Sequence, residues 1–454
     1  MSATEQPAPA ARLPFGGMRL VYQLLRFSMR AGATVSKFLL AIYTARYLGL
    51  ADLGMYGLLV GATTIVPAIV GLGMTEWTSR RLVDLPRAQA LPLIASRLSL
   101  TLSIHLIVQP LAFAADILLG EPVPLQTALL CGGILLLENL GSEASEMLIA
   151  RRRVFLAYFV AFLRVGFWPI PVMAIGLLYP ETRTLESILL GWLAMLVVSW
   201  LALLLLLLPE GRWRFMRPQW RLLFPELRGS LVLYIKDVSS TISMFLDRFL
   251  ISLFLGLEMT GVYTLFWSIT NVVHSLAVYD IIKAQLPSLI ASGRNPEPEQ
   301  FRAHERRLQI EIGSWSLLLA LGAGVAMPLL LPLLHQPLAQ ESLPVFWLIL
   351  LATLLRIAAD LYGFVLLALR RDRTIAWIAA AGALASAGLN LVLTPFFGLA
   401  GAATAYAMTS GGLLAARFVL SRSATIERND NTPGQLAAPG VLRADFTGNA
   451  GMQG

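Results

Sequence analysis

Long apolar segments recur along the whole chain, and short polar stretches separate them. Most segments have about 20 residues or more, the length that an α-helix needs to cross the hydrocarbon core of a bilayer. The pattern predicts twelve membrane-crossing helices, at about 22–45, 53–75, 92–118, 125–150, 154–179, 185–208, 230–255, 260–290, 308–334, 343–369, 374–396 and 399–420. Several segments contain Pro or Gly, which membrane helices tolerate better than soluble ones.

Arginine is concentrated in every second connection between these segments. The arginine-rich connections contain Arg80, Arg81 and Arg87; Arg151, Arg152 and Arg153; Arg212, Arg214, Arg217, Arg221 and Arg228; Arg294, Arg302, Arg306 and Arg307; and Arg370, Arg371 and Arg373. The connections between them hold chiefly Arg46 and Arg183. Because basic loops stay on the cytoplasmic side, we expect both termini in the cytosol and an even number of helices.

The two halves of the chain share a motif. Residues 48–66 return as residues 255–273 with eight of nineteen positions identical, including Gly49/Gly256, Gly54/Gly261, Tyr56/Tyr263 and Leu58/Leu265. A repeat of this length is typical of duplicated transporters, whose site lies between halves that rock against each other. The alternative is chance identity among Leu, Gly and Val in apolar sequence. The repeat predicts an all-α polytopic membrane protein with two six-helix lobes related by a pseudo-two-fold axis.

The repeat also divides the chain into parts. We expect a disordered cytosolic arm at 1–18, an N-lobe at 19–208, a linker at 209–228, a C-lobe at 229–420 and a disordered cytosolic tail at 421–454. In the linker, Trp213, Phe215, Trp220 and Phe224 alternate with arginines. Such a basic amphipathic segment is expected to lie on the membrane surface against anionic lipid; nucleic-acid binding by stacking is the alternative.

The composition agrees with a membrane protein. Hydrophobic residues make up 57% of the chain and charged residues 14%, where a soluble chain has about 25% charge. The net charge of +8 comes from arginines in alternate loops, so we expect no nucleic-acid partner. The chain begins without the pattern of a removable signal peptide. A single cysteine, Cys131, permits no intrachain disulfide, and we expect no metal site and no cofactor.

The first predicted helix carries a stripe of cations. Arg26, Arg30 and Lys37 fall within about 40° of one another on a helical wheel. A charge inside a membrane helix is costly, so it normally faces a cavity or a partner. The stripe predicts a cationic cavity for an anionic substrate. The alternatives are pairing with neighbouring acids and, for Arg26, snorkelling to the headgroups.

Other helices carry further charged candidates. Arg164, Lys236 and Arg248 are weaker candidates for the same cavity, because Glu138, Asp237 and Asp247 offer them acidic partners within the helices. Glu138 and Glu143 either hold these cations or take up a coupling proton. His274 and Asp280 are candidates for coupling or ion pairing, and a hydrogen-bonded packing role is the alternative for the histidine. Arg356 and Asp360 stand at ion-pair spacing.

The sequence gives no sign of an enzyme. It contains no P-loop, nucleophile elbow, paired Cys or His with ligand spacing, or Gly-rich nucleotide fingerprint after a strand. Energy for transport must then come from an ion gradient, the membrane potential or the substrate gradient.

Taken together in their order, several motifs resemble a known family. They are the Leu-Gly-x-x-x-x-Gly-x-Tyr hinge and its copy, Leu246-Asp247-Arg248-Phe249, Pro287 in Leu-Pro-Ser-Leu-Ile, and Asn390 followed by Pro395 and Gly398-Leu-Ala-Gly-Ala-Ala. Over residues 19–420 the chain resembles the Wzx-type oligosaccharide flippases, the polysaccharide biosynthesis proteins of the MOP superfamily. The resemblance implies two six-helix lobes around a central cationic cavity, as in the related MATE transporters.

The resemblance implies a function. Such proteins move polyprenyl-diphosphate-linked oligosaccharides, the repeat units of O-antigen or exopolysaccharide, from the cytosolic to the periplasmic leaflet by alternating access. This matches the cationic stripe, because arginine binds phosphate in bidentate fashion. A lipid II flippase and a MATE-like multidrug or cation antiporter remain alternatives, although the first helix lacks the acid expected of the latter. We expect a monomer in the bacterial inner membrane, next to lipids and the polymerase and glycosyltransferases of the same pathway.

Overall fold

The computed structural model describes residues 16–119, 124–207, 218–223, 227–294 and 298–431. Over these residues the regular secondary structure is entirely helical, and nine helices are long and apolar enough to span a membrane. The chain is therefore a multi-pass membrane protein. The helix count of twelve stays a prediction, because one of the nine spans, Asp372–Thr425, contains two of the expected segments.

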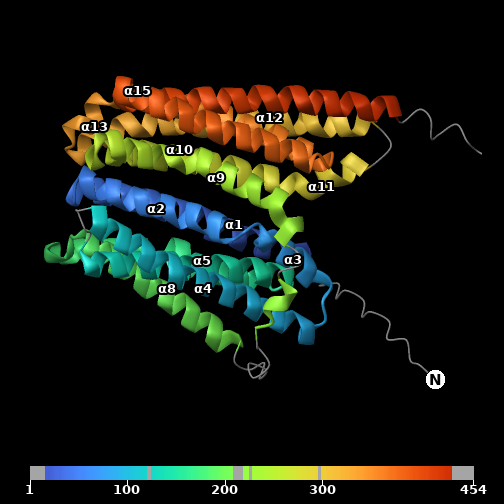
Figure 1. The fold of residues 1–454 in the computed structure, drawn as a ribbon. Coiled ribbons are helices and arrows are strands. Elements are labelled where there is room, and N and C mark those ends of the chain that lie inside the picture. Colours follow the sequence, from blue (N-terminus) through green and yellow to red (C-terminus); the bar gives the residue numbers. More distant parts are fainter. Residues whose placement is uncertain (1–15, 120–123, 208–217, 224–226, 295–297, 432–454) are drawn as a thin grey trace, which may run out of the picture.

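The N-lobe lies in the lower half of Figure 1, from blue to green. Its elements are α1 (Gly16–Tyr47), α2 (Leu50–Val70), α3 (Met74–Asp84), α4 (Arg87–Leu119), α5 (Leu125–Ala150), α6 (Val154–Phe162), the π-helix η1 (Leu163–Phe167), α7 (Pro169–Leu178), the 3₁₀ turn η2 (Pro180–Thr182) and α8 (Leu185–Leu207). The predicted fifth helix thus consists of α6, η1 and α7 in succession.

The C-lobe lies in the upper half, from yellow to red. Its elements are α9 (Leu227–Leu255), α10 (Leu257–Ser275), the π-helix η7 (Leu276–Ile282), α11 (Lys283–Arg294), α12 (Pro298–Leu334), α13 (Pro337–Glu341), α14 (Leu343–Ala368) and α15 (Asp372–Asn431). α15 is two helices that meet at Gly398, whose φ of 58° is not helical. Gly382 and Leu413 lie about equally far from Gly398 along the chain, on either side of it. A methyl group added to Gly382 would touch Leu413, so the two halves of α15 lie side by side and run antiparallel.

The repeat predicted from the sequence is confirmed by the backbone. Gly49 immediately precedes α2 with φ 108° and ψ 175°, and Gly256 immediately precedes α10 with φ 85° and ψ 178°. Both conformations favour glycine, because a side chain is disfavoured at positive φ. Tyr56 and Tyr263 are both buried one to two turns further on. The two copies therefore perform the same structural role in the two lobes.

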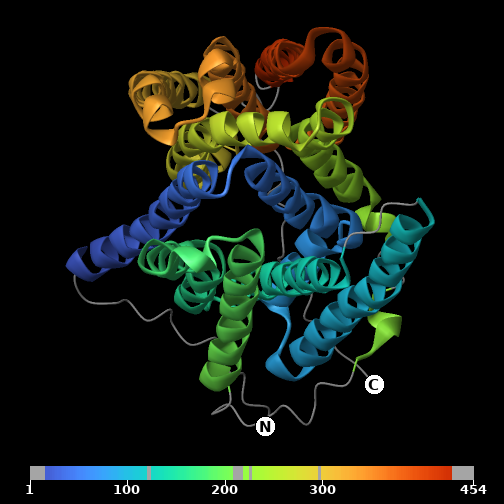
Figure 2. The same ribbon diagram turned by 90° about the vertical axis from the view of Figure 1, so that its left-hand side faces the viewer.

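α2 and α10 also form the centre of the seam between the lobes (Figure 2). A methyl group on Gly54 would lie 2.1 Å from the carbonyl oxygen of Leu257, and one on Gly261 would lie 1.9 Å from that of Leu50. In the repeat, Gly54 corresponds to Gly261 and Leu50 corresponds to Leu257, so each contact is the counterpart of the other. The two helices therefore cross on a pseudo-two-fold axis. Only glycine permits so close a crossing.

The connections at each end of the bundle agree with the predicted alternation. Arg151, which follows α5, donates from Nη1 to the carbonyl oxygens of Leu82 and Leu85 at 3.1 and 2.8 Å, so two arginine-rich connections share one end. At the opposite end, Gln336 donates to the carbonyl of Ala45 at 2.9 Å, which joins two arginine-poor connections. Figure 1 shows α3 and α13 at these opposite ends.

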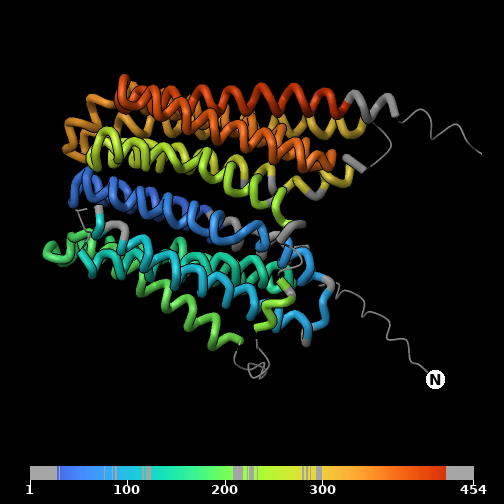
Figure 3. Tube along the Cα trace, viewed as in Figure 1, coloured from blue at the N-terminus to red at the C-terminus, as the bar shows by residue number. Residues whose placement is uncertain are grey.

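Two boundaries differ from the predictions. The expected disordered tail begins too early at 421, because α15 continues as a helix to Asn431. Its continuation is stabilised by burial of Ala424 in a cluster that also contains Leu366 and Ile378. The arm at 1–18 also ends earlier, since α1 begins at Gly16, and residues 1–15 lie outside the described part (Figure 3).

The linker prediction is only partly within the described residues. Residues 218–223 contain one 3₁₀ turn, η5 (Trp220–Leu222). Leu223 is buried against an N-lobe cluster that includes Met74 and Met147, while Trp220 is 37% exposed. The backbone N–H of Gln219 donates to Ser96. The described part of the linker is therefore docked on the N-lobe, next to α3 and α4.

Candidate substrate site in the N-lobe

An ion pair lies inside the N-lobe where α5 meets η1. Arg164 Nη1 is 2.7 Å from Glu138 Oε1, and the same nitrogen donates to the Glu138 carbonyl at 3.1 Å. Both side chains are buried. Gly141 makes room for the pair, because a methyl group there would lie 2.7 Å from Arg164 Cδ. The expected partnership of Arg164 with Glu138 is confirmed.

The π-helix explains how Arg164 reaches this position. A π-helical turn inserts one extra residue into a helix, and such turns are frequent at functional sites. Here it also exposes the Gly166 carbonyl, which accepts a hydrogen bond from Ser36 of α1 at 2.7 Å. Gly166 is needed there, since an added methyl group would lie 2.5 Å from Ala33 Cβ. The sequence thereby docks α1 directly on η1.

Lys37 follows Ser36 and completes the cluster. It is half-buried and interacts electrostatically with Glu138 and Arg164. Among the described residues no acid lies within ion-pair distance of its ammonium group, because Glu138 is held by Arg164. One oxygen of Glu138, Oε2, has no hydrogen-bond partner in the described part of the chain. The cluster of Lys37, Glu138 and Arg164 carries two cations and one acid.

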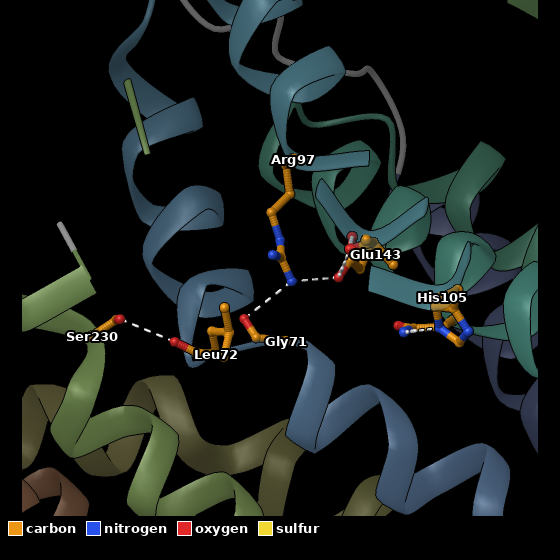
Figure 4. Close-up of polar contacts among 8 residues, drawn as sticks. Gly71, Leu72, Arg97, His105, Glu143 and Ser230 are labelled. Carbon is orange, nitrogen blue, oxygen red and sulfur yellow. Dashed lines mark hydrogen bonds and ion pairs between the residues drawn. The ribbon is translucent and has the colours of Figure 1, made fainter. Parts of the chain in front are cut away.

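A second buried pair joins α4 to α5. Arg97, fully buried, pairs through Nη2 with Glu143, and Thr101 donates to the same carboxylate at 2.9 Å. Arg97 Nη2 also donates to the carbonyl of Gly71 at 3.1 Å, just beyond the end of α2. Figure 4 shows these contacts. Glu143 thus has its full set of partners and holds Arg97 rather than any cation of α1.

The C-lobe contains a more crowded cluster centred on Asp360. Arg417 Nη1 and Arg356 Nε lie 2.7 and 3.6 Å from its Oδ1, and His274 Nε2 lies 3.0 Å from its Oδ2. Both oxygens of this one carboxylate are therefore engaged. The ion pair predicted from the spacing of Arg356 and Asp360 is confirmed, and His274 is hydrogen-bonded to the same carboxylate. Its role in coupling or in packing stays a prediction.

Among the described contacts, the side chains of Asp247 and Arg248 have neighbours other than each other. Tyr263 donates its hydroxyl to Asp247 Oδ2, and Oδ1 accepts the backbone N–H of Arg248. The guanidinium of Arg248 is fully buried, with its carbon 3.8 Å from the ring centroid of Trp267 and 4.9 Å from that of Phe245. Cation–π contact offsets part of its desolvation. Arg248 therefore faces rings of its own lobe.

The remaining candidates are distributed as follows. Lys236 Nζ lies 3.4 Å from Asp237 Oδ1, with both side chains partly exposed. Arg26 and Arg30 lie on α1 and Asp280 on η7, but their side chains fall outside the described residues. Of the three side chains in the cationic stripe, the structure therefore describes only that of Lys37.

Three polar or charged residues in the interior were not predicted from the sequence. Arg97 and Arg417 pair with Glu143 and Asp360, and His105 is hydrogen-bonded to Asn139 and Gln109 at 2.9 Å. The signal was present, because each stands inside a predicted membrane segment. A charge at that depth is expensive whether or not it belongs to a visible stripe.

Comparison with solved structures identifies the fold. The inward-facing conformation of a multidrug resistance MATE family transporter of the MOP superfamily matches with a TM-score of 0.68 at 14% identity, over 90% of this chain and 99% of that one. The lipid II flippase MurJ, in its inward closed conformation, matches with a TM-score of 0.67 at 11% identity, over 91% of each chain. The chain has the fold of the MOP-superfamily transporters.

A third MOP-superfamily transporter, from Pyrococcus furiosus and described as having a binding pocket of reverse polarity, matches with a TM-score of 0.57 at 13% identity, over 92% of this chain and 96% of that one. No protein-family model matches the chain, and no curated protein is similar to it in sequence. The solved neighbours are transporters and flippases, not enzymes. At these identities the likeness establishes the two-lobed fold and leaves the substrate to the chemistry of the site.

Proposed function

We propose that this protein flips a polyprenyl-diphosphate-linked oligosaccharide from the cytosolic to the periplasmic leaflet by alternating access of its two lobes. In this proposal Lys37 and Arg164, with Arg26 and Arg30 nearer the cytosolic end of α1, attract the diphosphate. Lys236 and Arg248 are secondary candidates, since Lys236 lies 3.4 Å from Asp237 and the Arg248 guanidinium stacks on the rings of Phe245 and Trp267. Glu138 positions Arg164 and is the acid available for a coupling proton.

The observation that carries the proposal is the surplus cation at Lys37. Glu138 has paired with Arg164, so the half-buried ammonium group lacks an acid at ion-pair distance within the described residues. A cation held inside a membrane protein without such a partner points to a cavity or an anionic ligand. The position suits a transported group, because α1 packs on η1 of its own lobe and on α10 of the other.

The balance of interior charge supports an anionic substrate. The buried charged residues in the described part of the chain are the cations Arg97, Arg164, Arg248, Arg356 and Arg417 and the acids Glu138, Glu143 and Asp247. The half-buried Lys37 adds one cation and the half-buried Asp360 adds one acid, so the excess remains two positive charges. A diphosphate supplies at least two negative charges, and arginine and lysine are the usual phosphate ligands.

Two related functions are the rivals. A lipid II flippase fits the same charge and the MurJ-like fold, and differs only in the glycan. A MATE-like antiporter of cationic drugs fits the fold, but the described part of α1 carries Lys37 and no acid. We also propose the bacterial inner membrane as location, both termini in the cytosol, a monomeric protein, and contact with the polymerase and glycosyltransferases of the pathway.

The test is an export assay in a deletion strain. Loss of the protein should make the lipid-linked glycan accumulate on the cytosolic side, and the intact gene should restore export. Lys37→Ala should fail to restore it while the protein reaches the membrane in normal amount. The control is Arg373→Ala, because Arg373 is an exposed cation of an arginine-rich connection and is not a candidate for the site. Normal export by Lys37→Ala would refute the role of the surplus cation, and accumulation of lipid II instead would favour the first rival.

A further inference from the structure

The turn between α2 and α3 has an unusual backbone. Gly71 still has a right-handed helical conformation, but Leu72 and Gly73 follow with φ of 50° and 67°. A left-handed conformation is disfavoured for leucine and persists only where the surroundings impose it. Two contacts, one from each lobe, hold the carbonyl groups of this turn in place.

The N-lobe holds the first carbonyl of this turn. Arg97 donates to the Gly71 oxygen, and Glu143 and Thr101 fix the guanidinium in turn. Arg97 is completely buried, and its Nε and Nη1 have no hydrogen-bond partner among the described residues. An arginine buried with unused donors is costly, so its placement here indicates a specific role.

The C-lobe holds the next carbonyl. Ser230 of α9 donates to the Leu72 oxygen at 3.0 Å, and Figure 4 shows this bond leaving the turn on the side opposite to Arg97. Gly73 packs on the backbone of the same helix, since an added methyl group would lie 2.5 Å from the Ser230 carbonyl oxygen and 2.7 Å from the Tyr234 nitrogen. Two consecutive carbonyls are thus held by different lobes.

The lobes are also joined at the other end of α2. There the reciprocal glycine crossing places Gly54 and Gly261 against backbone carbonyls of the opposite lobe. The hydrogen bond from Gln336 to Ala45 adds a further link between the lobes. At the α2–α3 turn, Ser230 donates to Leu72, Gly73 packs on α9, and α3 also contacts α9. We take this end as the one that opens, because among the described contacts the reciprocal crossing of two helix backbones lies at the other end.

We propose that the turn Gly71–Leu72–Gly73 is the latch that closes the lobes at the arginine-rich end, and that Arg97 is the residue that positions it. This rests on the alternating-access function proposed above. When the latch opens, the Leu72 carbonyl leaves Ser230 and accepts water, while the Arg97 contact keeps the turn attached to the N-lobe. The glycine crossing at the other end remains closed.

Distances between spin labels test the latch without any substrate. In a Cys131→Ala background, one pair of cysteines at Val83 of α3 and Ala303 of α12 reports the arginine-rich end, and a second pair at Leu178 and Leu333 reports the other end. All four positions are exposed. Pulsed dipolar spectroscopy of the purified protein in nanodiscs gives the populations of short and long distances for each pair.

Gly73→Ala should raise the ratio of open to closed at the arginine-rich end by about tenfold, because the added methyl group meets the α9 backbone. Arg97→Ala should give a similar shift and Arg97→Lys a smaller one, since lysine retains a donor for Gly71. Ser230→Ala, the mildest change, should raise the ratio about threefold. Gly313→Ala on α12 is the control, because nothing lies within 4 Å of the added methyl group.

Unchanged distances at the arginine-rich end in Gly73→Ala and Ser230→Ala, with both proteins eluting as folded monomers, would overturn the latch. A shift confined to the Leu178–Leu333 pair would also overturn it, because the mobile end would then be the other one. If the distances shift as expected but no lipid-linked glycan depends on the protein, the latch stands and the proposed function fails.

Discussion

The two lobes share a backbone but not a distribution of charge. In the C-lobe, Asp360 is surrounded by His274, Arg356 and Arg417, and both of its oxygens are engaged. In the N-lobe, Glu138 is paired with Arg164, and Lys37 lies nearby with no acid at ion-pair distance in the part of the chain that the structure describes. The same sequence signal, a charge inside an apolar segment, therefore has two meanings. We propose that the C-lobe cluster fixes the packing of its lobe and that the N-lobe cluster offers charge to a ligand.

The most severe test of this comparison is removal of the central acid of the C-lobe. Asp360→Ala leaves two buried arginines without their carboxylate, and loss of one partner of a buried ion pair costs about 3–5 kcal/mol. We expect the purified protein to lose most of its thermal stability in detergent and to accumulate poorly in the membrane. A variant of normal melting temperature would show that the C-lobe cluster is not structural.

The symmetry of the seam can be tested with two glycines. Gly54→Ala and Gly261→Ala each place a methyl group about 2 Å from a carbonyl oxygen of the other lobe, and overpacking of this kind costs about 1–3 kcal/mol. Because the two contacts are equivalent, the two losses of thermal stability should agree closely. Gly388→Ala, where the added methyl group meets open space, is the control. Strongly unequal losses would contradict the pseudo-two-fold crossing.

Removal of Arg164 from the N-lobe pair should lower the thermal stability less than removal of Asp360 from the C-lobe cluster. Arg164→Ala leaves Glu138 beside Lys37, which can then become its counter-ion, so part of the cost of about 3–5 kcal/mol for breaking a buried pair is recovered. We expect a lower melting temperature than in the wild type but a higher one than in Asp360→Ala. Export should be lost, since the surplus cation has been consumed. Thermal denaturation and the glycan assay on the same preparation check both parts.

The smallest effect on stability is expected for Lys37→Ala. The ammonium group has no acid within ion-pair distance in the described structure, so its removal should change the stability by less than about 1 kcal/mol. Export should nevertheless fall to the level of the deletion strain. A large loss of stability would instead place Lys37 among the structural charges and remove the difference between the lobes.

The sequence predicted the helices well because their signals are local. Each apolar run has the length of a bilayer crossing, and every predicted segment falls on a helix of the structure. Gly49 and Gly256 marked equivalent helix starts, because a backbone at positive φ requires glycine. Arg356 and Asp360 were paired correctly since four residues along a helix bring side chains together. α3 was not predicted, because its polar sequence lacks a membrane signal.

The sequence by itself determined the fold class, the repeat and the presence of charges inside the membrane helices. Only the tertiary structure decided which charges on different helices neutralise one another, since Arg97 lies 46 residues from Glu143 and Arg417 lies 57 residues from Asp360 in the chain. It also decided that no acid of the described residues lies within ion-pair distance of Lys37 and that the α2–α3 turn joins the lobes. The physical reason is that an ion pair is fixed by distance in space, and helix packing, not helical periodicity, sets that distance across neighbouring helices.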